Sequence, residues 1–444
     1  MTRALTAALL VLAAVCEALA GGLTFGPSSG NRVRSGVGRF PRWQVLSIAT
    51  DLPVRWLVAL GGRRLAAVQK DGTLLILEVD AAGLRVLARY GEVAGPDSPP
   101  VAIRLDHERV GAGVVGGDGR LLLWSDDGLY GYDVGAPLSR STFPVPITRE
   151  GRAGHDLLAV AQDGAVLLIG GLAGGAPRIL ARADVHALPD ARITLADLDG
   201  DGVVEAVVLT DPTDRHAHGA LGERADAASL TVLEVGAFGL AVRARRALAP
   251  PAVFTGVMVV LAPFGGRGAA LLLTGGSPGQ EGTLQVLAWR EGGLVLLATA
   301  PGQPWTHLIG ATDLTGDGVP EVVAVSDPHQ GGVLTAYRRR GAALAPVGRA
   351  SGYASHAPGS LNLDQAVIAD FDGNGRPEVV VPRQSRDVLA GLELAGDRFV
   401  ERWAVDLKSP IVSNLVAADL DGDGLLDLAV ADRRAIHVFL SLRP

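Results

Sequence analysis

Four copies of one nine-residue loop constrain the fold of this chain more than any other feature. The copies occupy residues 197–205, 313–321, 370–378 and 419–427. Each copy has oxygen-bearing side chains at loop positions 1, 3, 5 and 9, and glycine at positions 4 and 6. Each also lies between two apolar runs of the kind that form β-strands. The sequence therefore predicts a repeated strand–loop–strand unit.

The spacing of oxygen atoms in these loops suits a hard divalent cation. Calcium takes six to eight oxygen ligands at roughly 2.4 Å, which alternate residues of a tight loop supply, so we predict about four calcium ions. The two glycines allow the positive φ angles of such a turn. An EF-hand loop begins similarly, but here the last acid is at position 9 rather than 12 and no helical pattern flanks it. With position 7 offering its backbone carbonyl, the predicted ligands are Asp197, Asp199, Asp201, Val203, Glu205, Asp313, Thr315, Asp317, Val319, Glu321, Asp370, Asp372, Asn374, Arg376, Glu378, Asp419, Asp421, Asp423, Leu425 and Asp427.

Composition agrees with a large all-β chain. Of the 444 residues, 48% are hydrophobic and 59 are glycine, which favours many short strands and turns over long helices. The formal net charge of −7 and the absence of any basic run argue against a nucleic-acid partner. Cys16 is the single cysteine, so we expect no disulfide within the chain.

Residues 1–20 have the pattern of a secretory signal peptide. Arg3 precedes an apolar stretch, and residues 18–20 form a small-residue cleavage pattern before Gly21. Lipidation of Cys16 is the alternative, although Val15 fits that pattern poorly. No later apolar run is long enough to cross a membrane, since the best, residues 250–264, is too short. We therefore expect an extracytoplasmic protein, secreted or periplasmic, without a transmembrane segment. Residues 21–40 are predicted to be a flexible lead-in.

From residue 41 to residue 444 a module of roughly 50 residues repeats, as in solenoids and propellers. A module has two apolar strands, a hairpin, a third apolar strand and a more polar fourth strand. The last module ends after its third strand, and residues 43–48 offer the missing one. We therefore predict a β-propeller of four-stranded blades whose ring is closed by the N-terminal strand. Eight modules fit the sequence, with seven as the alternative if two early modules are one.

Two modules retain traces of the loop, the third with acids only at Glu150 and Asp156 and the fifth with none. In both, an arginine takes loop position 5: Arg152 in the third module and Arg267 in the fifth. Such an arginine either replaces the charge of the ion or faces solvent from a decayed loop.

The four loops and their flanking strands resemble the FG-GAP and VCBS-type repeats of integrin-α-like β-propellers. The resemblance covers nearly all of residues 41–444, although only four modules carry the calcium signature. It implies a propeller with calcium in the loops between the first and second strands of a blade, held by the acids at positions 1, 3, 5 and 9. Thr315 and Asn374 depart from the pattern, which lowers the charge of their loops. The family includes adhesion modules, lectin-like domains and non-catalytic parts of enzymes, so the resemblance leaves the function open.

No catalytic motif stands out, so we do not expect an enzyme. The sequence lacks a His-Glu-x-x-His motif and a phosphate-binding loop. Loops between second and third strands should form the face opposite the calcium loops, where the fourth module has a polar insert at residues 211–228. Binding residues concentrate on loops that a rigid scaffold holds. The candidate ligand-binding residues on this face are His216, His218, Trp305, His307, His329, Tyr353, His356, Arg383, Arg386 and Arg433.

Two functions remain open at this point. The favoured prediction is a monomeric calcium-binding interaction module for a protein or a glycan. The alternative is an extracytoplasmic hydrolase or lyase that acts on a glycan in a propeller cleft.

Overall fold

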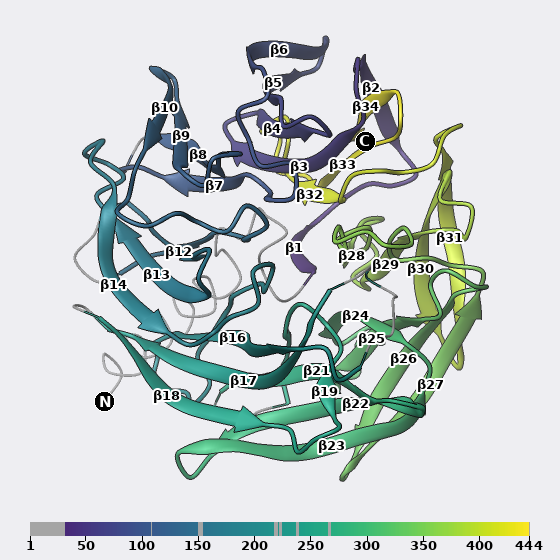
Figure 1. The fold of residues 1–444 in the computed structure, drawn as a ribbon. Helices are drawn as coiled ribbons and strands as arrows, with labels where there is room; N and C mark the ends of the chain where they lie inside the picture. The colour runs from purple at the N-terminus through teal and green to yellow at the C-terminus, as the bar shows by residue number, and fades with distance from the viewer. Residues whose placement is uncertain are drawn as a thin grey trace, which may run out of the picture.

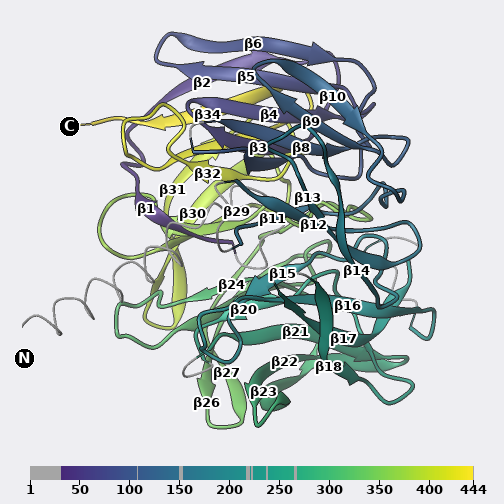
Figure 2. The same ribbon diagram turned by 90° about the vertical axis from the view of Figure 1, so that its left-hand side faces the viewer.

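The computed structural model describes residues 32–443, except for residues 108, 150–153, 217–220, 222–223, 237–238 and 265–267. The described part of the chain consists of strands and turns and contains no helix. Figure 1 shows the strands grouped into small sheets around a central axis, and Figure 2 shows the same ring from the side. The predicted signal peptide and Cys16 lie outside the described residues.

Consecutive strands pair in antiparallel units of four, with the first strand nearest the axis and the fourth at the periphery (Figure 1). Three units that carry no acidic loop are separate sheets: β3 (Val54–Gly61), β4 (Arg64–Gln69), β5 (Leu74–Asp80) and β6 (Gly83–Tyr90); β7 (Val101–Arg104), β8 (Val110–Val115), β9 (Leu121–Ser125) and β10 (Gly128–Tyr132); β11 (Val145–Ile147), β12 (Asp156–Val160), β13 (Ala165–Gly170) and β14 (Arg178–Asp184).

Further pairings join the next units into one larger sheet. Its successive antiparallel runs are β15 (Thr194–Ala196), β16 (Glu205–Thr213), β17 (Asp226–Val235) and β18 (Leu240–Ala247); β19 (Val253–Phe254), β20 (Val260–Ala262), β21 (Ala270–Ser277), β22 (Gln280–Arg290) and β23 (Gly293–Gln303); β24 (Thr306–Thr312), β25 (Glu321–Ser326), β26 (Val333–Arg340) and β27 (Ala343–Ser351); β28 (Val367–Asp370), β29 (Glu378–Pro382), β30 (Val388–Ala395) and β31 (Arg398–Asp406). Because these runs are linked by cross-pairings such as β23–β27, the blade number stays a prediction.

The two ends of the chain meet in one sheet, as predicted. Its strands are β32 (Val416–Ala418), β33 (Asp427–Ala431), β34 (Ala435–Ser441) and, outermost, β2 (Trp43–Ala49). β2 pairs with β34 in an unbroken antiparallel register from Trp43 opposite Ser441 to Ala49 opposite Ala435. Closure of the ring in this way pairs the edge that β34 would otherwise leave open. The fold is therefore a β-propeller closed by its N-terminal strand.

Aromatic side chains reinforce this closure. The rings of Phe40 and Trp43 lie 4.9 Å apart, and Phe40 is equally close to Trp403 of β31. Trp43 also meets Phe439 of β34 edge to face at 6.1 Å. Aromatic pairs at these separations add to the free energy gained by burial. The residues just before and within β2 are thus held by two neighbouring blades.

Two expectations about irregular segments were wrong. The lead-in is not unstructured throughout, because β1 (Val33–Val37) pairs in parallel with β28 near the propeller axis. No strand pattern is evident there, since β1 reads Val-Arg-Ser-Gly-Val and gains its partner only in the folded ring. The polar insert is also shorter than residues 211–228, because β16 and β17 extend into both of its ends.

The apolar core lies between neighbouring sheets. The inner strands are apolar on both faces, and β12 and β13 are buried along their whole length. One apolar cluster, for example, joins Leu57 and Leu65 to Val438 of the closing sheet. The fourth strands are largely exposed, as in β6. This packing explains the near-continuous apolar runs, because sheets that are covered on both faces do not need alternating polarity.

Candidate functional site

The four predicted metal loops occupy equivalent places in the fold. Each joins the first strand of a unit to the second: β15 to β16, β24 to β25, β28 to β29 and β32 to β33. This is the position that the family resemblance implies. All four loops therefore lie at the same end of their strand pairs.

The position-1 carboxylate shapes each loop by accepting two backbone N–H groups. In the last loop, Asp419 accepts from Gly422 at 2.8 Å and from Gly424 at 2.9 Å. Asp313 does the same with Gly316 and Gly318. The glycines at positions 4 and 6 have φ between +76° and +88° in the four loops, a region that side-chain-bearing residues rarely adopt. The repeated glycines are thus required by the backbone of the loop.

The position-9 acid is buried and closes the loop from below. Asp427 accepts the N–H of Leu420 at 2.8 Å and that of Ser441 at 2.7 Å. Burial raises the pKa of Asp427 to about 7 and that of Glu378 to about 8. Glu378 Oε1 is buried and has no hydrogen-bond partner among the described residues. A buried carboxylate without a counter-charge is costly, so these positions fit a bound cation.

Three of the loops bring their acids close enough to share one ion. Ligand oxygens lie within 4.8 Å of one another in each of three sets: Asp197, Asp199 and Glu205; Asp370, Asp372 and Glu378; Asp419, Asp421 and Asp427. These carboxylates are the groups that would hold calcium, and the ion would neutralise their charge. The loop at 313–321 does not form such a set, because Thr315 replaces its position-3 acid. The number of ions, and the role of the position-7 carbonyls, stay predictions.

Arginines from neighbouring strands reach into two of the loops. Arg243 of β18 forms ion pairs with Asp199, at 2.5 Å, and with Glu205. In the second loop, Arg338 of β26 donates to Asp317 at 2.8 Å and to Glu321 at 2.8 Å. A third arginine nitrogen contact, at 3.2 Å, joins Arg338 to the hydroxyl of Thr315. Sequence reasoning missed both arginines, because they lie outside the loop motif.

A metal-free module uses the same kind of pairing. In the third module, Arg149 forms a buried ion pair with Asp156 at 2.5 Å. Asp156 is the position-9 acid of the decayed loop, so an arginine supplies its counter-charge. The predicted position-5 arginines, Arg152 and Arg267, lie outside the described residues.

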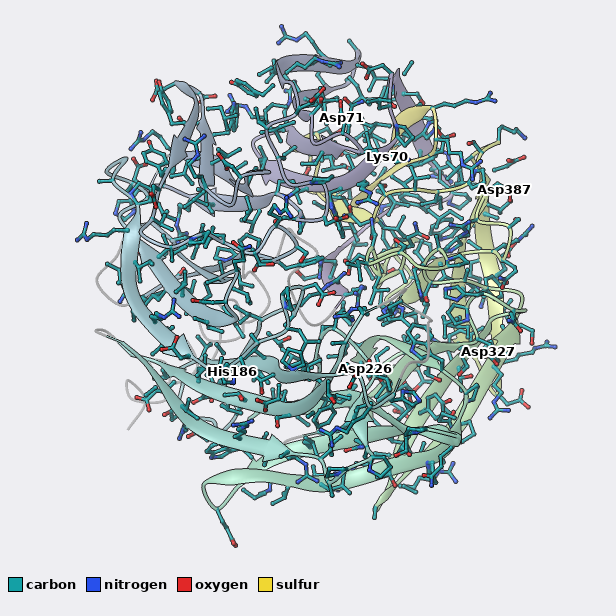
Figure 3. All side chains as sticks on the ribbon, viewed as in Figure 1. Lys70, Asp71, His186, Asp226, Asp327 and Asp387 are labelled. Carbon is teal, nitrogen blue, oxygen red and sulfur yellow. The ribbon has the colours of Figure 1, made fainter. Side chains whose placement is uncertain are left out.

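Four of the predicted ligand-binding residues form one cluster on the opposite end of the strands. We call this end the insert face; it consists of the loops between second and third strands and the connectors between units. The rings of Trp305 and His329 stack at 6.1 Å, and His329 and His356 join Nε2 to Nε2 at 3.1 Å. His307 lies edge-on to His356 at 5.4 Å. Figure 3 labels Asp327, which begins the loop of His329, and Asp226 beside the insert.

Burial keeps the imidazoles of this cluster uncharged at neutral pH. It lowers the pKa of His307 and His356 well below the usual value, and that of His329 to a smaller degree. Both ring nitrogens of His307 are buried without a hydrogen-bond partner among the described residues. The cluster thus combines the partly exposed rings of Trp305 and His329 with the buried, neutral imidazoles of His307 and His356.

The other predicted residues of the insert face are spread more widely. Tyr353 and Arg383 form a β-bridge, and both contact Glu401 at 3.3 Å or less. Burial, together with the charge of Arg433, lowers the pKa of Arg386, so these two arginines are near each other. They form a flank of the insert face rather than part of the imidazole cluster.

His216 approaches the cluster from the insert. Its Nδ1 lies 3.5 Å from a carboxylate oxygen of Asp226, which is 1% exposed. His216 and Trp305 line the same cavity, which is described below. Its predicted neighbour His218 lies outside the described residues.

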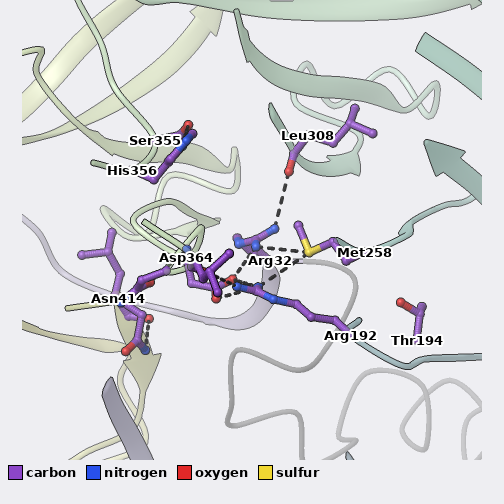
Figure 4. A network of polar contacts seen from close by, with 12 residues as sticks. Arg32, Arg192, Thr194, Met258, Leu308, Ser355, His356, Asp364 and Asn414 are labelled. Atoms are coloured by element: carbon purple, nitrogen blue, oxygen red, sulfur yellow. Dashed lines mark hydrogen bonds and ion pairs between the residues drawn. The ribbon is translucent and has the colours of Figure 1, made fainter. Parts of the chain in front are cut away.

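A buried charge network lies beneath the insert face near the axis (Figure 4). Arg192 donates to both carboxylate oxygens of Asp364, at 2.9 and 2.7 Å, and Arg32 pairs with the same carboxylate. Arg192 also stacks over the Phe143 ring at 4.2 Å. Arg32, just before β1, donates to the carbonyl of Leu308 in β24 at 3.5 Å. The network connects the N-terminal segment to several blades, and no sequence motif predicted it.

Comparisons with known proteins agree with this architecture. The crystal structure of Saccharomyces cerevisiae Sqt1 superposes with a TM-score of 0.56 at 10% identity and covers 92% of this chain and 100% of its own. The WD40 domain of SCAP from fission yeast gives a TM-score of 0.48 at 9% identity, covering 90% and 98% of the two chains. The fold defines the class of protein, a β-propeller. Residues 313–381, which contain the second and third loops, match the model of the FG-GAP-like repeat. The fold therefore confirms the predicted β-propeller, and the match over residues 313–381 confirms the predicted FG-GAP-like repeat.

Proposed function

We propose that this chain is an extracytoplasmic, calcium-binding β-propeller that binds a protein or a glycan through its insert face. A propeller interaction module is what the fold and the FG-GAP-like repeat support. Within the residues that the structure describes, no helical segment has the length and apolarity needed to span a bilayer. Secretion rests on the sequence pattern of residues 1–20.

Calcium binding is supported by the geometry of the loops. Three loops gather carboxylate oxygens within 4.8 Å, and the buried Oε1 of the position-9 acid Glu378 has no hydrogen-bond partner among the described residues. An ion in these loops would fix the turn between the first two strands of a blade. Its proposed role is to stabilise the scaffold, because the loops lie away from the insert face.

The observation that carries the binding function is the imidazole–indole cluster of the insert face. It joins Trp305, His307, His329 and His356 from three different loops or connectors. A rigid scaffold that presents aromatic and neutral polar groups on loops is typical of binding sites. The hydrolase alternative needs a pair of carboxylates at the substrate. The described residues that line the cavity on this face include no Asp or Glu, which favours binding over turnover.

A binding screen with one substitution tests the proposal. Trp305→Ala should abolish binding to whichever glycan or protein a panel identifies, because Trp305 contacts both the histidines and the cavity. Tyr130→Ala is the matched control, since Tyr130 is an exposed aromatic residue on the outer strand β10. An equal loss of binding in both variants would contradict the assignment of the binding site to the insert face. Product formation from glycosides would favour the hydrolase or lyase alternative.

A point substitution is preferable to deletion of the insert. Leu221 is buried, and Arg224 forms an ion pair with Asp190. Deleting residues 215–224 would therefore disturb packing as well as binding.

A further inference from the structure

A cavity of about 200 Å³ opens on the insert face where β21, β22 and β24 end. Trp305 forms one wall and His216 another, and the hydroxyl-bearing side chains of Thr255, Thr274 and Thr283 lie between them. This volume is below the roughly 300–1,000 Å³ of pockets for drug-sized ligands. The cavity therefore suits a small ligand or one terminal group of a larger one.

The walls of the cavity are polar but uncharged. Its lining contains no Lys, Arg, Asp or Glu, and the carboxylate of Asp226 lies behind His216. In the described part of the chain, no hydrogen bond is assigned to the hydroxyls of Thr255, Thr274 and Thr283. A hydroxyl both donates and accepts, so these groups are able to pair with hydroxyls of a ligand.

Glycines keep the floor of the cavity open. A methyl group added at Gly276 would lie 3.3 Å from Cε1 of His216 and 3.0 Å from Cγ2 of Thr255. One added at Gly275 would come within 2.8 Å of the amide nitrogen of Gln285. The cavity exists because these positions lack side chains.

We propose that this cavity binds one uncharged sugar ring at the end of a glycan. A sugar ring has an apolar face that fits against the Trp305 indole and a rim of hydroxyls that matches the three threonines. An anionic or cationic ligand would find no counter-charge in the lining, and an apolar side chain would leave the threonine hydroxyls without partners. This inference rests on the proposed function, since it selects the glycan among the possible partners.

The test is to titrate the full chain with methyl glycosides and to measure binding by calorimetry or saturation-transfer NMR. Neutral hexosides, deoxyhexosides and N-acetylhexosaminides are compared with uronic and sialic acid glycosides. We expect binding of at least one neutral glycoside, and a loss of about tenfold in affinity for Thr283→Val, which removes one hydroxyl at nearly constant shape. Thr299→Val is the matched control, because Thr299 lies on the adjacent strand β23 and does not line the cavity.

Several results would overturn the inference. They are equal affinities in the Thr283 and Thr299 variants, tighter binding of the acidic glycosides, or no binding of any neutral glycoside. Failure of the inference is distinguishable from failure of the proposed function. If a panel partner binds, is lost in Trp305→Ala and is not displaced by any glycoside, the interaction module stands and the sugar assignment falls. If no partner of any kind binds, both fall.

Discussion

The four loops of one sequence motif separate into two kinds. In the loops at 197–205 and 313–321, an arginine from an outer strand pairs with the acids. In the loops at 370–378 and 419–427, the acids at positions 1, 3 and 9 have no arginine ion pair within the described chain, and the position-9 pKa values are raised to about 8 and about 7. The first pair of loops thus has an internal counter-charge at its buried position-9 acid, whereas in the second pair the arginine ion pair to a loop acid is the exposed Arg443–Asp423 contact at 3.4 Å.

The register of the neighbouring strands explains this difference. Arg338 lies directly opposite the position-9 acid Glu321 on the adjacent strand. In the first loop, the residue opposite Glu205 is Glu234, and the arginine comes instead from β18. In the last loop, Leu428 pairs with Phe439, which places Leu440 beside Asp427. An internal guanidinium competes with calcium for the same oxygens, so the loops at 370–378 and 419–427, whose acids at positions 1, 3 and 9 have no arginine ion pair in the described chain, should bind the ion more tightly.

Removal of the N-terminal strand should have the largest effect of all, and it acts on the loop at 419–427. The loop at 419–427 lies in the closing sheet, where Asp427 is bonded to Ser441, and Ser441 Oγ accepts the N–H of Arg39. A chain that begins at residue 52 lacks β2 and exposes the edge of β34, so we expect aggregation and loss of this calcium site. Light scattering coupled to size-exclusion chromatography measures the aggregation. A chain that begins at residue 38 retains β2 and Phe40 and serves as the control. A monomeric chain 52–444 with an unchanged melting temperature would refute the role of β2.

Chelation has the next largest effect and measures how many loops bind. Extracellular calcium modules bind at around 10⁻⁴ to 10⁻³ M. At ten times the dissociation constant, each site adds about 1.4 kcal/mol to the free energy of unfolding. Four sites would contribute roughly 5–6 kcal/mol, and the loops at 370–378 and 419–427 alone about half of that. Chemical denaturation with and without chelator, together with equilibrium dialysis, distinguishes the two outcomes. If the chain binds no calcium and its stability does not respond to chelator, both the four-site and the two-site predictions are wrong.

Substitution of Arg338 should destabilise the chain much more without calcium than with it. In chelator, Arg338→Ala leaves Glu321, which is fully buried, without its ion-pair partner, a loss of about 3 kcal/mol. In calcium, the loop loses its internal competitor, so its affinity for the ion should rise and most of the stability should return. Arg340→Ala is the control, because Arg340 is exposed on the same strand. If Arg338→Ala is equally destabilised in calcium and in chelator, the competition between arginine and ion is wrong.

Much of the fold was predictable because it depends on local pattern. The acidic loops, their glycines and the apolar runs predicted the strand order, the first-to-second-strand position of the loops and the closing strand β2. The same reasoning brought Trp305, His307, His329 and His356 to one face. These features follow from repeated spacing, which a single sequence displays.

The features that were missed depend on contacts between distant residues. Arg338 meets Glu321 only through the pairing of β25 with β26, and a loop motif does not include the opposite strand. β1 finds its partner more than 300 residues away in β28, and nothing in its own composition marks it as a strand. The Arg32–Asp364 pair has the same cause. The loop motif thus predicted where the candidate metal sites lie, while the pairing register of the neighbouring strands determines how these sites differ.

The smallest predicted effect compares the position-5 acids of one loop of each kind. Asp423 lies in the loop at 419–427, where its arginine partner is the exposed Arg443 at 3.4 Å, and Asp317 lies in the loop that Arg338 enters. At a calcium concentration that fills only the tighter loops, Asp423→Ala should remove one ion and about 1.4 kcal/mol of calcium-dependent stability. Asp317→Ala should leave the ion count unchanged there, because Arg338 rather than calcium neutralises the acids of its loop. Equilibrium dialysis counts the ions, and denaturation at the same calcium concentration gives the stability. Loss of one ion in both variants would show that the loops are equivalent despite the arginines.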